Sequence, residues 1–471
     1  MVFSSLTFLC LFLPIVIGLH TLVKNTRARN AILLIASLLF YAWGEPVWIL
    51  AMIFSTLVNY VSARVIAGAQ SQRASKAALI IGVLISLSSL VFFKYSAFLV
   101  NSVCALAGSS FRMTAPKLPI GISFYTFQII TYTVDVYRGE ARLQKNPFWL
   151  LLYVSLFPQL IAGPIVRFKQ VAEAIEDREV TRAGFGEGFF RFCLGLGKKV
   201  LLANLCGEVL ATLPTGAEMS CLSGWLSAIL FSFQIFFDFS GYSEMAIGLG
   251  RMLGFRFAEN FDAPFISKSV SEFWRRWHIS LGTFFREYVY IPLGGNRVGT
   301  GRWIFNMIVV WGLTGIWHGA SWNYLLWGLY SGFFLILERL VLRRVLDKTP
   351  SVIRHILVLL VMVASMVIFR NESFAALGSQ LKAMCAPWTV PASDPFAVYA
   401  LKSNPVLLIA CVVCSLPLRK WAVKKFRERR ERGKRNVLRP YGKAVLAVLI
   451  LGLSVMFLVG QSFNPFLYFR F

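Results

Sequence analysis

Two histidines stand in tryptophan-rich segments of this chain, and an imidazole in such a place suits proton transfer. His278 ends the run Trp-Arg-Arg-Trp-His at residues 274–278, and His318 follows Trp317 inside the apolar residues 303–327. Ionisable side chains within a membrane span are costly, so they usually face a protein-lined or water-filled interior and mark a functional path. The pattern indicates a buried site in which His318 is the first residue to test.

The surroundings of His318 favour a catalytic base over a packed core histidine. The small residues Gly315 and Gly319 predict open space beside its ring. Thr314 lies four residues before His318 and Ser321 three residues after it, so either hydroxyl could orient a ring nitrogen and fix the tautomer. A neutral imidazole can take the proton of a hydroxyl group that attacks an acyl carbon, which contributes about 10²–10⁴-fold to the rate.

His278 is more ambiguous from its neighbours alone. It follows Trp274 by four residues, so a continuous helix would place both on one face and turn Arg275 and Arg276 aside. The residues by themselves favour a satisfied histidine at a crowded interface. The motif resemblance described below favours a supporting catalytic or structural role.

The arginines around His278 allow two interpretations. Each one alone is best explained as an anchor at the lipid headgroups, where basic side chains commonly lie. As a cluster they suit the phosphate groups of an acyl donor, because a guanidinium group binds phosphate with two parallel hydrogen bonds. The predicted acyl-donor contacts are Trp274, Arg275, Arg276 and Arg286.

Asp238 and Tyr242 form a further polar pair on a predicted helix. Their spacing of four residues puts them on one face, and packing and function weigh equally for them. The chain has no Gly-x-Ser-x-Gly elbow and no cysteine in an electropositive motif, which favours direct transfer over a Ser- or Cys-acyl enzyme. The Cys-x-x-Cys at 411–414 lacks a second pair or a nearby histidine, so we predict no metal site.

Composition places these residues in a membrane. The chain is 57% hydrophobic and 15% charged, more apolar than the ~45–50% of soluble domains. Apolar runs suited to spans of about 20 residues predict an all-α polytopic protein with roughly ten to twelve crossings. Residues 123–135 and 265–302 are too polar for lipid-facing helices, so we expect them to line the interior or to be re-entrant.

The formal charge of +26 is explained by cytoplasmic loops rather than by nucleic acid. The densest basic cluster, residues 419–443, lies between two apolar spans and lacks interleaved aromatic residues. We expect it to face the cytoplasm and to contact anionic membrane lipids.

Several motifs together resemble the membrane-bound O-acyltransferase (MBOAT) family, in the bacterial polysaccharide-acetylating branch typified by alginate O-acetyltransferase. They include Trp-Arg-Arg-Trp-His-Ile-Ser-Leu at 274–281, Tyr-Ile-Pro-Leu-Gly-Gly-Asn-Arg at 290–297 and Trp-His-Gly at 317–319. Further matches at 121–128, 163–167, 237–248 and 464–471 extend the resemblance over most of the chain. It implies one polytopic domain, residues 1–471, with its catalytic motifs at 110–330.

The resemblance also implies an architecture and a reaction. A helical ring with re-entrant and interfacial helices would surround a funnel open to the outside and a cytoplasmic donor tunnel, with His318 where they meet and His278 nearer the cytoplasm. No bound cofactor is implied: acetyl-CoA is the expected acyl donor and an exported polysaccharide the final acceptor. An extracytoplasmic partner protein with an esterase-like fold would complete the transfer at the bacterial cytoplasmic (inner) membrane.

Other functions fit the same sequence features. Within the family, transfer of D-alanine to teichoic acid and lipid O-acylation are alternatives. A proton-coupled transporter is the alternative from a different class, because many spans and a buried histidine also describe such a carrier. The sequence has no convincing internal repeat of the kind that transporters often contain, which favours the enzyme.

Overall fold

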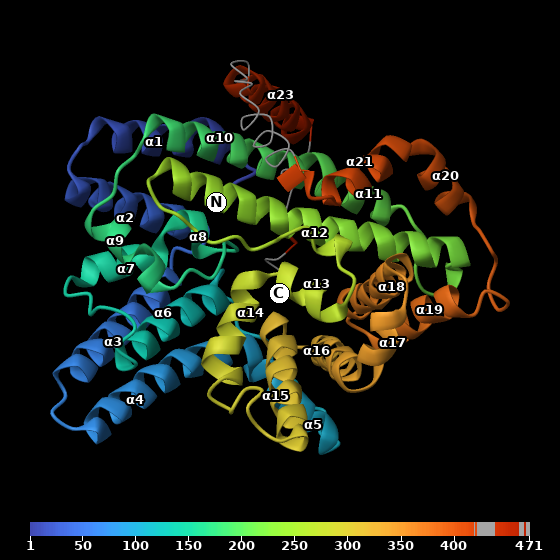
Figure 1. Ribbon diagram of the computed structural model, residues 1–471, viewed down its shortest axis with the longest axis horizontal. Coiled ribbons are helices and arrows are strands. Elements are labelled where there is room, and N and C mark those ends of the chain that lie inside the picture. Colours follow the sequence, from blue (N-terminus) through green and yellow to red (C-terminus); the bar gives the residue numbers. More distant parts are fainter. Residues whose placement is uncertain (419, 422–438, 461–465, 468–471) are drawn as a thin grey trace. The chain divides into compact units, whose positions relative to one another are not determined.

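The computed structural model describes residues 1–418, 420–421, 439–460 and 466–467, and every regular element in these ranges is helical (Figure 1). This confirms the all-α prediction. Most of the basic cluster at 419–443 and of the motif at 464–471 lies outside the described residues.

The elements follow one another along the chain in two groups. Up to the long helix α12 they are η1 (Phe8–Phe12), α1 (Leu13–Leu22), α2 (Thr26–Ala42), α3 (Ile49–Gly68), α4 (Gln72–Leu90), η2 (Val91–Tyr95), α5 (Ser96–Leu106), α6 (Ile122–Tyr137), α7 (Pro147–Ser155), α8 (Phe157–Leu160), α9 (Phe168–Glu176), α10 (Arg182–Gly197), η3 (Lys198–Asn204), α11 (Leu205–Ala211), η4 (Gly216–Glu218) and α12 (Cys221–Met252). The rest are η5 (Pro264–Ile266), α13 (Val270–Arg276), α14 (Ile279–Phe285), η6 (Arg286–Tyr290), α15 (Thr300–His318), α16 (Trp322–Leu337), η7 (Glu338–Leu342), α17 (Arg343–Lys348), α18 (Ser351–Arg370), α19 (Phe374–Cys385), α20 (Pro395–Ser403), α21 (Pro405–Ser415) and α23 (Arg439–Gly460).

Internal contacts divide the chain into two compact units. The first comprises Met1–Cys193, Tyr242–Ala258 and Leu458–Phe471, and the second comprises Leu194–Gly241 and Glu259–Phe457. In the first unit α3, α4 and α6 lie side by side; in the second α15 lies along α16, with α13 and α14 next to them (Figure 1). Both histidines of interest belong to the second unit.

Six helices in the described ranges are long and apolar enough to cross a membrane, or seven if the bent pair α20–α21 counts as one span. They are Ile49–Gly68, Gln72–Leu106, Cys221–Met252, Trp322–Lys348, Ser351–Arg370 and Tyr441–Gly460. The roughly ten to twelve crossings expected from apolar runs of about 20 residues are therefore not confirmed. The first apolar helix, Phe8–Leu22, is shorter than a full span, and α15 interrupts its apolar run with polar residues.

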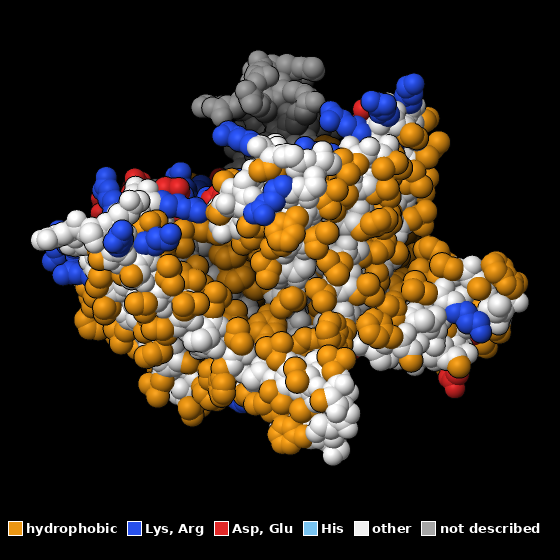
Figure 2. Space-filling model, turned by 90° about the horizontal axis from the view of Figure 1, so that it is seen from below, with side chains coloured by type: hydrophobic (Ala, Val, Ile, Leu, Met, Phe, Trp, Pro, Cys, Tyr) orange, Lys and Arg blue, Asp and Glu red, His pale blue; other side chains and the backbone are white. Residues whose placement is uncertain are grey.

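The outer faces of these helices are apolar. Figure 2 shows hydrophobic side chains over much of the face that it displays, with lysine and arginine side chains gathered toward one edge. On α18 the exposed set is Val352, Ile353, Ile356, Leu357 and Leu360. Such faces suit lipid contact, because the bilayer core contains no water that could form hydrogen bonds with exposed polar groups.

The polar segment at 123–135 forms α6, and nearly all of its side chains are buried, including Gln128, Thr131 and Asp135. The prediction that this segment faces the protein interior rather than lipid is confirmed. The helix begins after Gly121, whose backbone is left-handed with φ +75°, a conformation that glycine adopts without strain.

Close packing of α15 against α16 fixes the position of His318. A Cβ atom at Gly315 would lie 2.3 Å from the carbonyl oxygen of Tyr324, and one at Gly319 would lie 2.3 Å from the ring of Tyr324. The interpretation that these glycines leave open space beside His318 is therefore wrong. They allow the two helices to approach closely, as small residues do at helix contacts in membranes.

We predict that Gly315→Ala destabilises the protein by about 1–3 kcal/mol, because the added methyl group clashes with backbone of α16 that cannot move independently. Gly312→Ala is the matched control on the same helix: its Cβ would lie 4.0 Å from the nearest atoms, in ordinary contact with Leu325 and Leu329. Thermal unfolding in detergent, followed by tryptophan fluorescence, measures both. Equal apparent Tm values for the two variants would contradict this account of the helix contact.

Candidate active site

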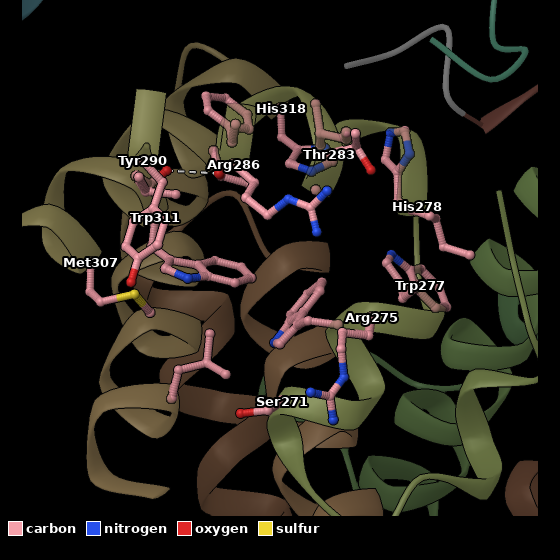
Figure 3. A pocket seen from close by; sticks show the side chains of 18 of the residues that line it. Ser271, Arg275, Trp277, His278, Thr283, Arg286, Tyr290, Met307, Trp311 and His318 are labelled. Atoms are coloured by element: carbon pink, nitrogen blue, oxygen red, sulfur yellow. Dashed lines mark hydrogen bonds between the residues drawn. The ribbon is translucent and has the colours of Figure 1, made fainter. Parts of the chain in front are cut away.

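A cavity of about 350 Å³ lies in the second unit among α13, α14, η6, α15 and α16 (Figure 3). Six residues singled out from the sequence line it: His278, His318, Trp274, Arg275, Arg286 and Thr314. Segments 40 residues apart in the chain thus meet at one cavity. Its walls are mainly aromatic and aliphatic, and its polar groups are few.

His318 is the last residue of α15, which ends where Gly319 takes an extended backbone conformation. Its side chain is buried, and its ring meets the ring of Trp327 edge to face at 4.8 Å and that of Phe369 at 5.3 Å. These aromatic contacts fix the plane of the imidazole.

The two hydroxyl groups proposed as partners of His318 occupy different places. The Thr314 hydroxyl donates to the carbonyl of Val310 at 2.7 Å, so toward the cavity it offers a lone pair rather than a proton. Ser321 is the N-cap residue of α16 and is not among the cavity-lining residues.

The helix that carries Trp274 is short and firmly capped. The Ser269 hydroxyl accepts a hydrogen bond from the main-chain N–H of Glu272, a typical N-cap arrangement. The carboxylate of Glu338 accepts a hydrogen bond from the N–H of Val270 at 2.6 Å. Its negative charge also interacts favourably with the positive N-terminal end of the helix dipole. The segment at 265–302 is thus a series of short helices and turns rather than a clean span, as predicted.

His278 is not on the same helix as Trp274, so the predicted stacking of the two on one helical face is wrong. Helix α13 ends at Arg276, Trp277 is extended, and His278 has a left-handed backbone with φ 45°. The cause is a backbone pairing with an earlier segment: the N–H of Asp262 donates to Arg276, and the N–H of Ile279 donates to Asn260, each at 2.9 Å. These bonds pull residues 276–279 out of the helix.

The side chain of Asn260 fixes the orientation of His278. Its Oδ1 atom accepts hydrogen bonds from the main-chain N–H and the hydroxyl of Ser280, at 3.2 and 2.9 Å. Because a main-chain N–H can only donate, this atom is the amide oxygen and not the nitrogen. His278 Nδ1, 3.1 Å from the same oxygen, must then carry the proton and donate it. The other ring nitrogen, Nε2, is left as a hydrogen-bond acceptor.

Burial keeps this imidazole neutral. His278 is 3% exposed, and the ring of Phe239 meets it edge to face at 4.6 Å. Desolvation lowers the pKa of His278 to about 3. At neutral pH His278 therefore has no charge, and its Nε2 atom can accept a proton or a hydrogen bond but cannot donate one.

The predicted arginine cluster divides in the structure. Figure 3 shows the guanidinium group of Arg286 reaching into the cavity and that of Arg275 extending toward Ser271. Arg286 is 64% exposed and lies 3.3 Å from Glu287, which leaves it accessible to an anionic ligand. Arg276 is not among the cavity-lining residues: it pairs with Glu272 at 2.8 Å and with Asp262.

Neither Asp238 nor Tyr242 is among the residues that line the cavity. Asp238 is buried in an ion pair with Lys199 at 2.6 Å, within the second unit. Tyr242 belongs to the first unit, where its ring stacks on that of Phe3 at 4.6 Å. Both side chains have packing partners in this structure.

Sequence reasoning missed several cavity residues and the residue that orients His278. Trp311, Trp327, Tyr290 and Met307 line the cavity, and Asn260 holds the histidine. Asn260 lies in an irregular loop without a recognisable pattern, so no local signal marked it. Trp311 and Trp327 lie in the apolar run 303–327, where a tryptophan is expected as a packing or lipid-facing side chain. In the described ranges, no group of three or more His, Cys, Asp or Glu side chains could hold a metal ion.

Comparison with known proteins shows which family and which relatives the chain resembles. The family model of MBOAT, the membrane-bound O-acyltransferase family, matches residues 87–378, a range that contains the whole cavity. The chain is 37% identical to the probable alginate O-acetylase AlgI of Azotobacter vinelandii, with 100% of both chains covered. It is 30% identical to the peptidoglycan O-acetyltransferase of Helicobacter pylori, over 100% of this chain and 98% of the relative. Similarity to the teichoic acid D-alanyltransferase of Streptococcus thermophilus is 31% identity over 48% of this chain and 58% of the relative.

We predict that Asn260→Ala lowers acyl transfer by about tenfold or more, because the donors of His278 and Ser280 lose their buried acceptor. Asn260→Asp keeps an acceptor oxygen and should restore much of the activity. Its negative charge favours the imidazolium form, so the pKa of His278 rises and the acid limb of the pH–rate profile moves to higher pH. Wild-type rates and an unchanged profile in both variants would show that Asn260 has no part in the site.

Proposed function

The chain belongs to the membrane-bound O-acyltransferase family, and from this premise we propose that it moves an acetyl group from cytoplasmic acetyl-CoA toward hydroxyl groups of an exported polysaccharide. It is a multi-pass membrane protein and an O-acyltransferase. The full-length relatives named above are a probable alginate O-acetylase and a peptidoglycan O-acetyltransferase, and because alginate and peptidoglycan are both glycans, these names support the acetyl group and the polysaccharide acceptor.

The observation that carries this proposal is the cavity with two buried imidazoles. His318 acts as the base: it takes the proton of the acceptor hydroxyl while that oxygen attacks the carbonyl carbon of the thioester. The imidazolium so formed then gives its proton to the leaving sulfur. No nucleophilic serine or cysteine is required, which agrees with direct transfer.

His278 supports the reaction without a charge. With Nδ1–H bound to Asn260, the acceptor atom of its ring is Nε2, and we assign to this atom a hydrogen bond from a substrate hydroxyl or thiol. A residue held in a left-handed backbone conformation carries strain that the surrounding structure must offset, and such strain is common at functional sites. The hydrogen bonds to Asn260 supply that support.

The size and charge of the cavity fit a small acyl group. A volume of about 350 Å³ is at the low end of the roughly 300–1,000 Å³ typical of small-molecule sites. The cavity therefore suits an acetyl group with part of the coenzyme A arm and not a polymer chain. Arg286 and Arg275 provide positive charge for the phosphate groups of coenzyme A. Trp274 forms part of the apolar wall along which the coenzyme A arm would lie.

We infer the cellular setting from the reaction. A cytoplasmic donor and an exported acceptor require an enzyme in the bacterial cytoplasmic (inner) membrane, and a polymer too large for the cavity requires an extracytoplasmic partner protein for the last transfer. D-alanyl transfer is the second candidate, and it is supported by a similarity that spans only 48% of the chain.

The test uses purified protein in liposomes, with acetyl-CoA on one side and, on the other, short de-O-acetylated alginate oligosaccharides, whose terminal hydroxyl groups do not need the partner protein that the polymer requires. Thiol release should require the acceptor, and His318→Ala should lower it by about 10²–10⁴-fold because the base is gone. His355→Ala is the matched control: this histidine lies on α18, outside the cavity, and its Nδ1 atom is 3.0 Å from the carbonyl of Ser267. It should retain wild-type activity.

Two results would contradict the proposal. Undiminished thiol release by folded His318→Ala would remove this residue from catalysis. Absence of thiol release by the wild-type protein, together with a proton flux across the liposome membrane, would favour a proton-coupled transporter. D-alanyl transfer predicts no reaction with acetyl-CoA but reaction with a D-alanyl thioester.

A further inference from the structure

Acyl transfer needs hydrogen-bond donors as well as a base. When a hydroxyl oxygen attacks a thioester, negative charge develops on the carbonyl oxygen, and donors aimed at that oxygen usually make the largest contribution to catalysis. His278 cannot be such a donor in its resting state, because its protonated nitrogen is bound to Asn260. The donors must come from other residues of the cavity.

Two tryptophans of the cavity wall carry buried hydrogen-bond donors. The Nε1 atoms of Trp274 and Trp327 are buried and have no hydrogen-bond partner among the described residues. An indole N–H can only donate, and native proteins leave few buried donors unused. Trp327 is 2% exposed, so solvent does not satisfy its donor. A ligand atom that accepts hydrogen bonds would account for both donors.

These rings stand beside the proposed base. The ring centre of Trp327 is 4.8 Å from that of His318 and 5.5 Å from that of Trp274. Trp327 is held there by the packing of α16 on α15, because a Cβ atom at the next residue, Gly328, would lie 2.2 Å from the carbonyl oxygen of Trp311. Trp274 packs against the ring of Trp311 at 4.8 Å. The proposed base and the two indole rings therefore form one continuous group of contacting rings at the cavity.

We propose that the indole N–H groups of Trp327 and Trp274 bind the carbonyl oxygen of the thioester and stabilise the oxyanion formed from it, an inference that rests on the proposed function. The acceptor oxygen forms a bond to the carbonyl carbon, its proton passes to His318, and the carbonyl electron pair moves onto the oxygen held by the two indoles. When the carbonyl re-forms, the carbon–sulfur bond breaks and the sulfur takes the proton from His318. Ester and thiol are the products.

A purely structural role for the two rings is the competing explanation. Trp274 meets Trp327 at an interplanar angle of 82°, and Trp327 meets His318 at 83°. In such edge-to-face contacts an N–H group can point at a neighbouring π face, a weaker interaction than a hydrogen bond to oxygen. The two explanations differ in what they predict for kcat and KM.

The test measures kcat and KM for acetyl-CoA in the liposome assay for Trp327→Phe and Trp274→Phe. Each change removes the N–H and keeps an aromatic ring. Loss of an oxyanion donor should lower kcat on the order of 10²-fold and leave KM within about twofold of wild type. Trp225→Phe is the matched control, since it removes an indole N–H that donates to the carbonyl of Met384 at 3.1 Å, away from the cavity.

An unchanged kcat, or a rise in KM alone, would overturn the inference and leave the rings with a packing role. If Trp327→Phe does not fold, Trp274→Phe decides by the same criteria, because its half-buried ring tolerates truncation better. Failure of the proposed function has a different signature: the wild-type protein itself would then show no acetyl transfer, and the inference would fall with it.

Discussion

The close approach of α15 and α16 is the constraint on which the site depends. Gly315 and Gly328 bring the two backbones into contact, and no side chain larger than hydrogen fits at either position without movement. Between helices in a membrane there is little hydrophobic driving force, so dispersion contacts of this kind carry much of the association. Because His318 ends α15 and Trp327 lies on α16, the same contact sets the distance between the proposed base and the proposed donor.

The second histidine is positioned by a different kind of interaction. His278 owes its place to hydrogen bonds between two irregular segments, 260–262 and 276–280, which end α13 and impose a left-handed residue. A loop inside a membrane protein persists only where its polar backbone is satisfied by protein. Asn260 meets this requirement and, with the same oxygen, selects the tautomer of His278. Structural support and chemical function therefore cannot be separated at this residue.

The sequence predicted the fold class and six of the residues that line the cavity, and its failures have physical causes. Composition and apolar runs identified a helical membrane protein, the cost of burying an ionisable group identified His318 and His278, and the clustering of arginines identified Arg286. The predicted helical stacking of Trp274 and His278 failed because spacing describes a regular helix, whereas a distant backbone pairing breaks this one. Asp238 was a candidate by residue type, but its ion-pair partner, Lys199, is remote in sequence and carries no local signal. Arg276 pairs with Glu272 one helical turn away, a contact that the spacing of four residues could have indicated, and also with the more distant Asp262.

The charged and neutral groups of the cavity follow a division that the low dielectric of the interior requires. Full charges are kept where solvent or a counter-ion reaches them: Arg286 is exposed beside Glu287, and Arg276, outside the cavity, is paired with Glu272. The buried end holds neutral groups, namely a histidine whose pKa is lowered to about 3 and indoles that donate without a charge. A neutral donor has a small desolvation cost while the site is empty and interacts strongly once an oxyanion forms nearby. An arginine at the same depth would need a permanent counter-ion, which would compete with the oxyanion. Tryptophan is thus a suitable donor for a reaction whose negative charge exists only in passing.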